Sequence, residues 1–135
     1  MLKTHSKRYI EMAFGHEKRK RIADADGHGK RTGDCGDTIE IFIRVKDGRI
    51  VQTFFDINGC ANTAACANTV SKLSEDKTLE EAWEIDVDDI IAYLETLPPE
   101  HYHCAQLAAG AFFLALSDYS ANQRGQWKKL YANKG

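Results

Sequence analysis

The sequence predicts an α/β fold of the α+β kind, in which a small antiparallel sheet is combined with several helices. Residues 38–45 alternate between apolar and polar side chains, and residues 50–57 form a second apolar segment. The Asp47-Gly48 pair between them is a strong hairpin signal. Helical apolar spacing after this hairpin supplies the second half of the prediction.

The residues before the hairpin are expected to form a helix, a strand and a loop. Residues 5–14 carry apolar side chains at helical spacing and are followed by Gly15. A short strand is expected over 22–26. The polar stretch that follows contains four glycines, so we expect a mobile loop that carries Cys35.

The residues after the hairpin are expected to be helical, and proline and capping signals divide them. Residues 60–73 are rich in alanine, Thr78 to Glu81 has the capping-box pattern, and 86–95 has helical apolar spacing. Leu97-Pro98-Pro99 interrupts the helices. The expected order then ends with a long, mostly buried helix over 100–119 and a weaker helix over 122–135.

Length and composition favour a single domain over residues 1–135, with a core at about 5–120 and a helical tail at 121–135. The chain is 43% hydrophobic, which suffices for a packed core. A net charge of −2 argues against a nucleic-acid-binding protein, and the basic cluster at 18–21 is expected to be a solvated segment.

Cysteine usage indicates a reducing, cytoplasmic setting. The first eight residues lack the apolar segment of a secretory signal, so four reduced thiols are expected rather than disulfides. The longest apolar run covers only residues 107–116, which is too short for a membrane span. We therefore expect neither a membrane nor a nucleic-acid partner.

Three of the four cysteines stand in settings that suit chemistry. Cys60 and Cys104 are expected at helix starts, where the helix dipole lowers thiol pKa values and where thiols are commonly exposed. Glycines flank Cys35, while Asp37 and His103 add a carboxylate and an imidazole to the set. Thiolates select zinc, copper(I) or iron–sulfur centres, and a carboxylate among them makes the site more exchangeable. This donor set predicts an inorganic centre that is meant to leave.

The remaining cysteine and histidines are assigned to simpler roles. Cys66 belongs to a short internal repeat, in which Cys60-Ala61-Asn62-Thr63 is followed by Cys66-Ala67-Asn68-Thr69. It is expected to be a small core residue. His28 is expected in the glycine-rich loop, without a ligand role, and solvated side chains are expected for the remaining histidines, His5, His16 and His101.

On three motifs the chain resembles the NifU/IscU family of iron–sulfur cluster assembly scaffolds. These are Cys35-Gly36-Asp37 ahead of a strand, Gly59-Cys60 after the second long strand, and Leu97-Pro98-Pro99 followed by His103-Cys104. Order and spacing fit the family over about residues 5–120. The resemblance implies a sheet of about three strands covered on one face by helices, with the cysteines gathered at one exposed end.

The resemblance also implies a role for each motif residue. Cys35, Cys60 and Cys104 would hold a transient 2Fe-2S cluster, Asp37 would be the exchangeable ligand, and His103 an alternative ligand. Cys104 would also accept sulfur. The implied partners are a cysteine desulfurase that delivers persulfide sulfur, apo iron–sulfur proteins that receive the cluster, and an Hsp70-type chaperone. Such a scaffold binds iron without turning over a substrate.

The chain departs from the family pattern at the chaperone motif. That motif commonly reads Leu-Pro-Pro-Val-Lys, whereas Glu100 and His101 follow the prolines here. Zinc-dependent sulfur-acceptor relatives usually carry another residue in place of His103 and an insertion between the first two cysteines. Neither change is present in this sequence.

Two other functions remain open from the sequence. One is a zinc protein, either with a closed site of Cys35, Asp37, Cys60 and Cys104 or as a zinc-binding sulfur acceptor of the same fold. The other is an enzyme in which His103 or His101 activates Cys104. Neighbouring residues on a helix point about 100° apart, so His103 is expected to be poorly placed to take the Cys104 proton. Asp37 and His103 could also be purely local helix-start or strand-start residues.

Overall fold

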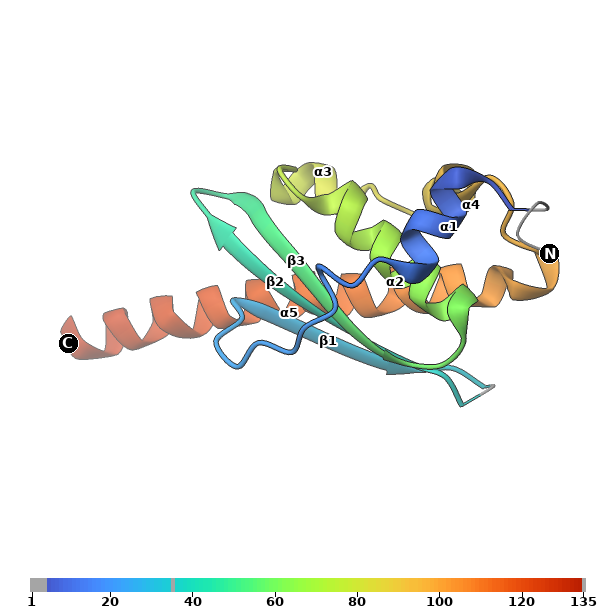
Figure 1. The fold of residues 1–135 in the computed structure, drawn as a ribbon. Coiled ribbons are helices and arrows are strands. Elements are labelled where there is room, and N and C mark those ends of the chain that lie inside the picture. Colours follow the sequence, from blue (N-terminus) through green and yellow to red (C-terminus); the bar gives the residue numbers. More distant parts are fainter. Residues whose placement is uncertain (1–4, 35, 135) are drawn as a thin grey trace.

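The structure, a computed structural model, describes residues 5–34 and 36–134, and for residues 124–134 it describes the backbone alone. Its sheet has three antiparallel strands in the order β1 (Gly27–Thr32), β2 (Thr38–Lys46) and β3 (Arg49–Asn58). The tight turn at Asp47-Gly48 joins β2 to β3, as the sequence predicted. Figure 1 shows this sheet with the helices gathered against it.

The described residues also form five α-helices and one short 3₁₀-helix. Their bounds are α1 (Lys7–Phe14), α2 (Ala61–Ser74), α3 (Leu79–Trp83), α4 (Val87–Leu94), η2 (Pro99–His101) and α5 (Tyr102–Lys134). The capping box predicted at Thr78 is present, and Asp86 forms a second one: each side chain accepts a hydrogen bond from the backbone N–H of the third helical residue, and each backbone N–H donates one to that residue's side chain. These local signals explain why the short helices α3 and α4 begin where they do.

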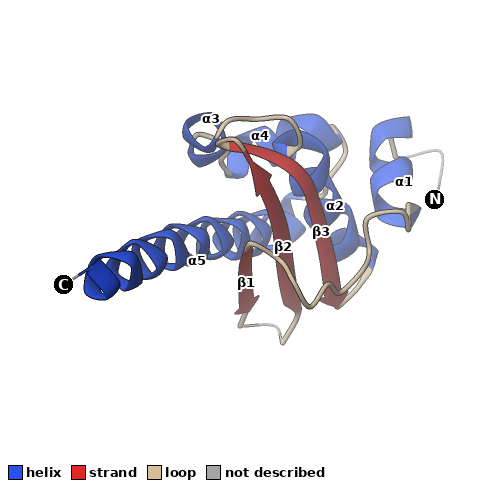
Figure 2. Ribbon diagram, turned by 90° about the vertical axis from the view of Figure 1, so that its left-hand side faces the viewer, coloured by secondary structure: helices blue, strands red, loops and turns tan. Residues whose placement is uncertain are grey.

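The hydrophobic core lies between the sheet and helices α2 and α5. Ile39, Ile41 and Ile43 alternate along β2 and are fully buried, with Phe55 and Phe112 among the largest side chains beside them. Figure 2 shows the helices behind one face of the sheet. The predicted α+β fold, with helices on one face, is confirmed.

The opposite face of the sheet is covered by an extended segment rather than by helices. Phe42 and Phe54 point to this face and are only 4% and 7% exposed. Arg21 contacts the Phe42 ring, and Lys18 and Lys20 lie over Phe54. The basic cluster at 18–21 was predicted to be solvated, and Arg19, Lys20 and Arg21 are indeed exposed. In addition, Lys18, Lys20 and Arg21 lie over these aromatic rings.

The expected strand over 22–26 is wrong, and so is the first part of the expected glycine-rich loop, because strand β1 occupies Gly27–Thr32. The described residues that flank Cys35, 33–34 and 36–37, do form a loop. Glycine normally weakens a strand. Here a Cβ at Gly27 or Gly29 would collide with the backbone of α5, at Ala115 and Ala111 respectively. The glycines therefore let β1 approach α5 closely. This close packing stabilises a strand in a segment whose composition predicts a loop.

Helix α5 runs without interruption from Tyr102 to Lys134 and extends beyond the sheet (Figure 1). The helix expected over 100–119 and the weaker one expected from Asn122 onward are thus one element, with Gly135 outside the described residues. No helix within residues 5–34 and 36–134 has the length and apolar character needed to cross a membrane.

Candidate metal and cluster site

The chemistry-bearing residues from three chain segments meet at one end of the sheet. Asp37 precedes β2, Cys60 is the N-cap residue of α2, and Cys104 lies in the first turn of α5. The hairpin returns the chain to Asp37, since Thr38 pairs with Asn58 at the ends of β2 and β3. Strand pairing thereby brings residues that are more than 20 positions apart in sequence to one place.

Thr63 is the point at which these segments touch. Its hydroxyl donates a hydrogen bond to Asp37 Oδ2 at 2.6 Å. The same oxygen lies 3.7 Å from Cys60 Sγ and 3.8 Å from Cys104 Sγ. Thr63 is fully buried, so the two sulfurs and the carboxylate are held around a fixed atom.

Gly59 leaves room for the Asp37 carboxylate. A Cβ at Gly59 would lie 2.9 Å from Asp37 Cγ and 2.7 Å from Thr63 Oγ1, closer than side-chain atoms normally approach. The glycine of the Gly59-Cys60 motif therefore has a steric role. It allows the start of α2 and the residue before β2 to come into contact.

Cys60 is exposed. The pKa of its thiol is lowered, as the sequence predicted for a helix start. Partial burial of the sulfur raises the pKa of Cys60, but the backbone and side-chain groups of Thr63 and Asn62 that face the sulfur outweigh this effect. The pKa of the thiol therefore lies below its ordinary value. A larger thiolate fraction at neutral pH favours both metal binding and nucleophilic attack.

Cys104 differs from the prediction, because it is 0% exposed. The sequence suggested that both helix starts would present their thiols to solvent. Cys104 instead faces inward between α5 and α2, where its sulfur contacts the buried Thr63 hydroxyl. A helix start sets the direction of the dipole but not which side of the helix is covered.

His103 also differs from its predicted placement, since its Nε2 atom lies 3.6 Å from Cys104 Sγ. The expectation that neighbouring helical residues diverge was wrong here. His103 Nδ1 lies 3.1 Å from the carbonyl oxygen of Glu100, and this hydrogen bond turns the ring so that Nε2 reaches the sulfur. A ring whose Nδ1 carries the donated proton keeps a lone pair on Nε2.

Tyr9 and Asn62 form an outer layer that the sequence analysis missed. Helix α1 places Tyr9 over the start of α2, where its hydroxyl donates to Asn62 Oδ1. Asn62 Nδ2 in turn lies 3.7 Å from Cys60 Sγ. Burial, and after it the negative charge of the Cys60, Cys66 and Cys104 thiolates, raises the pKa of Tyr9.

A signal for Thr63 and Asn62 was present in the sequence. Polar side chains at the second and third helical positions commonly satisfy groups at a helix start. The sequence Cys-Ala-Asn-Thr occurs twice, at 60–63 and at 66–69, but only the first copy stands at the start of α2. The second copy is buried inside the helix, with Cys66 0% exposed as predicted.

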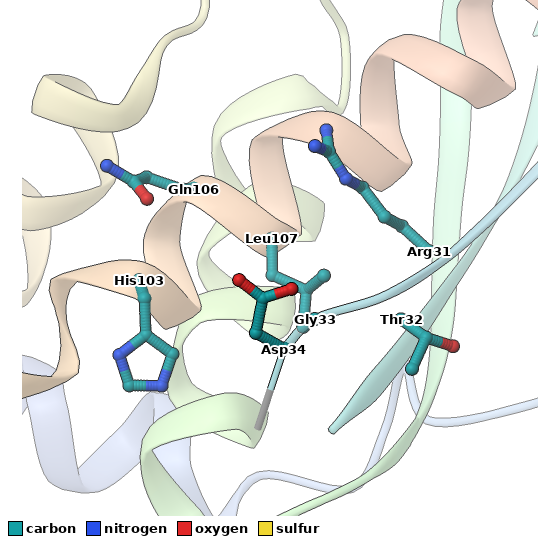
Figure 3. Close-up of a pocket in the computed structure, with 7 residues that line it drawn as sticks. All are labelled: Arg31, Thr32, Gly33, Asp34, His103, Gln106 and Leu107. Carbon is teal, nitrogen blue, oxygen red and sulfur yellow. The ribbon is translucent and has the colours of Figure 1, made fainter. Parts of the chain in front are cut away.

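Cys35 lies outside the described residues, and its two neighbours are described. Asp34 lines a cavity of about 560 Å³, which Arg31, Thr32 and Gly33 border from the end of β1. His103, Gln106 and Leu107 close it from α5, as Figure 3 shows. The segment on the N-terminal side of Cys35 therefore faces His103 across an open cavity.

The other histidines divide into three groups. His28 is on β1 rather than in a loop, and its Nε2 lies 2.7 Å from Glu40 on the face of the sheet away from the thiols. His16 is exposed, as predicted. His5 and His101 were expected to be solvated, but His5 stacks on Tyr9 and His101 is half-buried, because the segments around α1 and η2 pack against the domain.

The donors that meet here fit a soft or borderline metal. Thiolate, imidazole and carboxylate groups converge at this end of the sheet. Such a mixed set suits zinc or iron–sulfur binding and leaves the hard carboxylate as the weaker ligand.

Comparison with known proteins agrees with this geometry. The family profile described as the NifU-like N-terminal domain matches residues 17–126. The chain is 38% identical over 116 residues to "Iron-sulfur cluster assembly scaffold protein IscU 1" of Archaeoglobus fulgidus, covering 82% of this chain and 76% of the relative. It is 37% identical to "Iron-sulfur cluster assembly scaffold protein IscU" of Haemophilus influenzae, covering 85% of this chain and 98% of the relative.

A solved structure shows the same fold at much lower identity. The N-terminal NifU-like protein of Brucella abortus superposes with a TM-score of 0.70 at 16% identity, covering 86% of this chain and 94% of that one. Fold, family profile and full-length relatives point to one assignment. The chain belongs to the NifU/IscU-type family.

Proposed function

We propose that the protein is a scaffold on which an iron–sulfur cluster is assembled and from which it is passed to apo-proteins. Cys35, Asp37, Cys60 and Cys104 hold a transient 2Fe-2S cluster, and His103 serves as an alternative ligand. The observation that carries this proposal is the contact of Thr63 with Asp37, Cys60 and Cys104 together. The names of the relatives support the same role.

Sulfur delivery assigns different tasks to the two described thiols. A cysteine desulfurase supplies sulfur as a persulfide, and the Cys104 thiolate attacks its outer sulfur. A Cys104 persulfide forms and the desulfurase thiolate leaves. Conversion of that sulfur to sulfide requires two electrons, which an external thiol or electron-transfer protein supplies. Cys60, with its exposed sulfur and lowered pKa, provides the ready iron ligand.

Release of the cluster depends on Asp37. A carboxylate is a hard ligand and binds iron in a thiolate-rich site less tightly than a fourth thiolate would. The thiolate of a recipient apo-protein can displace it first. An Hsp70-type chaperone that binds near Leu97-Pro98-Pro99 would assist this step, with Glu100 and His101 changing the usual docking sequence.

Anaerobic reconstitution tests the proposal directly. Incubation of the reduced protein with iron and sulfide is expected to give the visible absorption of a 2Fe-2S cluster, which then disappears as an apo-ferredoxin becomes loaded. Cys60→Ser is expected to prevent stable assembly, whereas Cys66→Ser retains it. Assembly that proceeds equally well without Cys60 would reject the scaffold site, and stoichiometric zinc with no cluster would favour the zinc-binding sulfur acceptor.

Asp37→Ala tests the release step. The reconstituted cluster is expected to persist longer and to transfer more slowly, because the easily displaced ligand is gone. Cluster lifetime and transfer are followed by visible absorption and by the gain of ferredoxin activity. Asp34→Ala is a matched control on the same segment. An unchanged lifetime together with unchanged transfer would remove Asp37 from the mechanism.

Mass mapping tests the path of sulfur. After incubation with a desulfurase and cysteine, alkylation is expected to locate the added sulfur chiefly on Cys104 and essentially none on Cys66. Both thiols are buried, so the contrast depends on the position of Cys104 at a helix start and next to His103, which lines the cavity. A label concentrated on Cys66 would contradict both assignments.

A further inference from the structure

His101, His103 and Cys104 form a cluster of metal-binding side chains at the start of α5. One donor atom from each lies within 4.8 Å of the others. The 3₁₀-helix η2 ends at His101 and α5 follows immediately, so the tight turn of η2 brings the first side chain back over the next two. His101 has no counterpart among the motif residues that define the proposed cluster site.

The geometry of His103 and Cys104 matches what a shared tetrahedral ion requires. Metal–nitrogen bonds of about 2.0–2.1 Å and metal–sulfur bonds of about 2.3 Å place two donors about 3.5–3.6 Å apart at a tetrahedral angle. His103 Nε2 and Cys104 Sγ are 3.6 Å apart. The hydrogen bond between His103 Nδ1 and the Glu100 carbonyl oxygen orients the ring, as backbone carbonyls commonly do for metal-bound histidines.

His101 supplies the independent observation. Its Nδ1 atom is buried and has no hydrogen-bond partner in the described part of the chain. Buried polar atoms without partners are rare, and each calls for an explanation such as an ion. The rings of His101 and His103 lie with centroids 5.9 Å apart and an angle of 37° between their planes, so they are not packed flat on each other.

We propose that His101, His103 and Cys104 bind one divalent transition-metal ion of borderline softness, such as Zn²⁺ or Fe²⁺. Two imidazoles and one thiolate suit these ions, and three protein ligands leave a fourth position open for exchange. The three ligands come from one short segment of chain. The site therefore needs neither Asp37 nor Cys60, in contrast to the proposed cluster site.

The proposed metal site and the proposed cluster site share His103 and Cys104. The role of the ion in cluster assembly therefore rests on the proposed function. An ion held at the start of α5 would be in place before Asp37, next to β2, and Cys60, at the start of α2, bind to it. The binding of the ion itself can be measured without any cluster. Failure of one proposal is therefore distinguishable from failure of the other.

Co²⁺ is the appropriate spectroscopic probe for the full chain. Titration into the reduced, metal-free protein is expected to give one bound equivalent, with intense visible bands of tetrahedral Co²⁺ and a thiolate-to-cobalt charge-transfer band. Zn²⁺ and, under anaerobic conditions, Fe²⁺ are expected to displace it. His101→Gln is expected to weaken Co²⁺ binding at least about tenfold, a loss that even residues that merely orient a ligand commonly cause.

Three variants decide the outcome. His16→Gln, at an exposed histidine away from the site, is expected to bind as tightly as the native chain. The double variant Asp37→Asn with Cys60→Ser is expected to retain Co²⁺ binding. His101→Cys is expected to increase the charge-transfer band, because a second thiolate joins the ion, and this gain serves as the test if His101→Gln does not fold.

Two results would overturn the site. One is unchanged Co²⁺ affinity in folded His101→Gln, or no added charge-transfer intensity in His101→Cys. The other is loss of binding in the double variant, which would place the ion on Asp37 and Cys60. Co²⁺ binding through His101 without any cluster on reconstitution would instead retain this site and reject the scaffold function.

Discussion

Cys60 and Cys104 both stand at the start of a helix, and their sulfurs lie 3.7 Å and 3.8 Å from the same Thr63 hydroxyl. They nevertheless differ in exposure, because Cys60 is open to solvent while Cys104 is 0% exposed. The N-cap residue of α2 stands outside its helix and projects from the end of the sheet. The first turn of α5 packs against α2 and buries the side chain there.

This difference separates two properties that a helix start is often assumed to provide together. The helix dipole favours a thiolate at either position. Access to solvent, to a desulfurase or to an alkylating reagent depends instead on tertiary packing. The site thus has one thiol available for immediate reaction and one that must be uncovered, and the following experiments examine that contrast.

The largest expected effect is on alkylation. In the metal-free protein, iodoacetamide is expected to modify Cys60 at least about 100-fold faster than Cys104 or Cys66, since a local opening that costs about 3 kcal/mol leaves about one molecule in 100 reactive. Peptide mass mapping of quenched samples gives each rate. In urea the rates should converge. Equal rates for Cys60 and Cys104 in the folded protein would show that the start of α5 is open.

A smaller effect is expected from Thr63→Val, which keeps the shape of the side chain but removes the hydroxyl. Loss of its hydrogen bond to Asp37 should lower the free energy of unfolding by about 1.5–3 kcal/mol, as for hydrogen bonds to charged groups. The pKa of Cys60 should rise, because Thr63 is among the groups that lower it. Urea unfolding and the pH profile of Cys60 alkylation measure the two effects.

Thr69→Val is the matched control for Thr63→Val. Thr69 is also buried on α2, but its hydroxyl donates to the Ala65 carbonyl oxygen of its own helix instead of to Asp37. This variant should lose stability while the pH profile of Cys60 stays in place. If Thr63→Val left that profile unchanged, Thr63 would not be the residue that links the two helix starts.

The smallest expected effect, counted per pH unit, is on the pH dependence of stability, and it has opposite signs for Cys60 and for the buried Cys66. Burial raises the pKa of Cys66. Above the ordinary thiol pKa of about 8.5, the unfolded chain loses this proton while the folded chain keeps it. Cys66 should therefore lower stability by up to about 1.4 kcal/mol per pH unit as the pH rises beyond that value.

Cys60 should act in the other direction, because its pKa is lowered in the folded protein. Its contribution to stability is gained as the pH rises from the folded pKa to the ordinary value, and it is lost as the pH falls through the folded pKa. Urea unfolding between pH 6 and pH 10.5 compares the native chain with Cys60→Ala and Cys66→Ala. Cys66→Ala should lessen the alkaline decline, and an identical slope in both variants would contradict the contrast.

Local sequence signals predicted most of the fold. The Asp47-Gly48 turn, the alternation along β2 and the capping box at Thr78 each act over a few neighbouring residues. The same holds for Asp37, Cys60, His103 and Cys104, whose motifs could be recognised without a structure. Whether these four residues hold a cluster remains a proposal that the experiments above address.

Amino-acid sequence alone thus determined the hairpin, the helix starts and the types of donor atom in this protein. Tertiary structure alone decided that glycines form strand β1, that Cys104 is buried and that Thr63 joins the thiols to Asp37. It also decided that His101 Nδ1 is buried with no hydrogen-bond partner among the described residues. The physical reason is that turns and caps depend on adjacent residues. Burial and convergence depend on how closely α5 approaches β1 and α2, which no local pattern records.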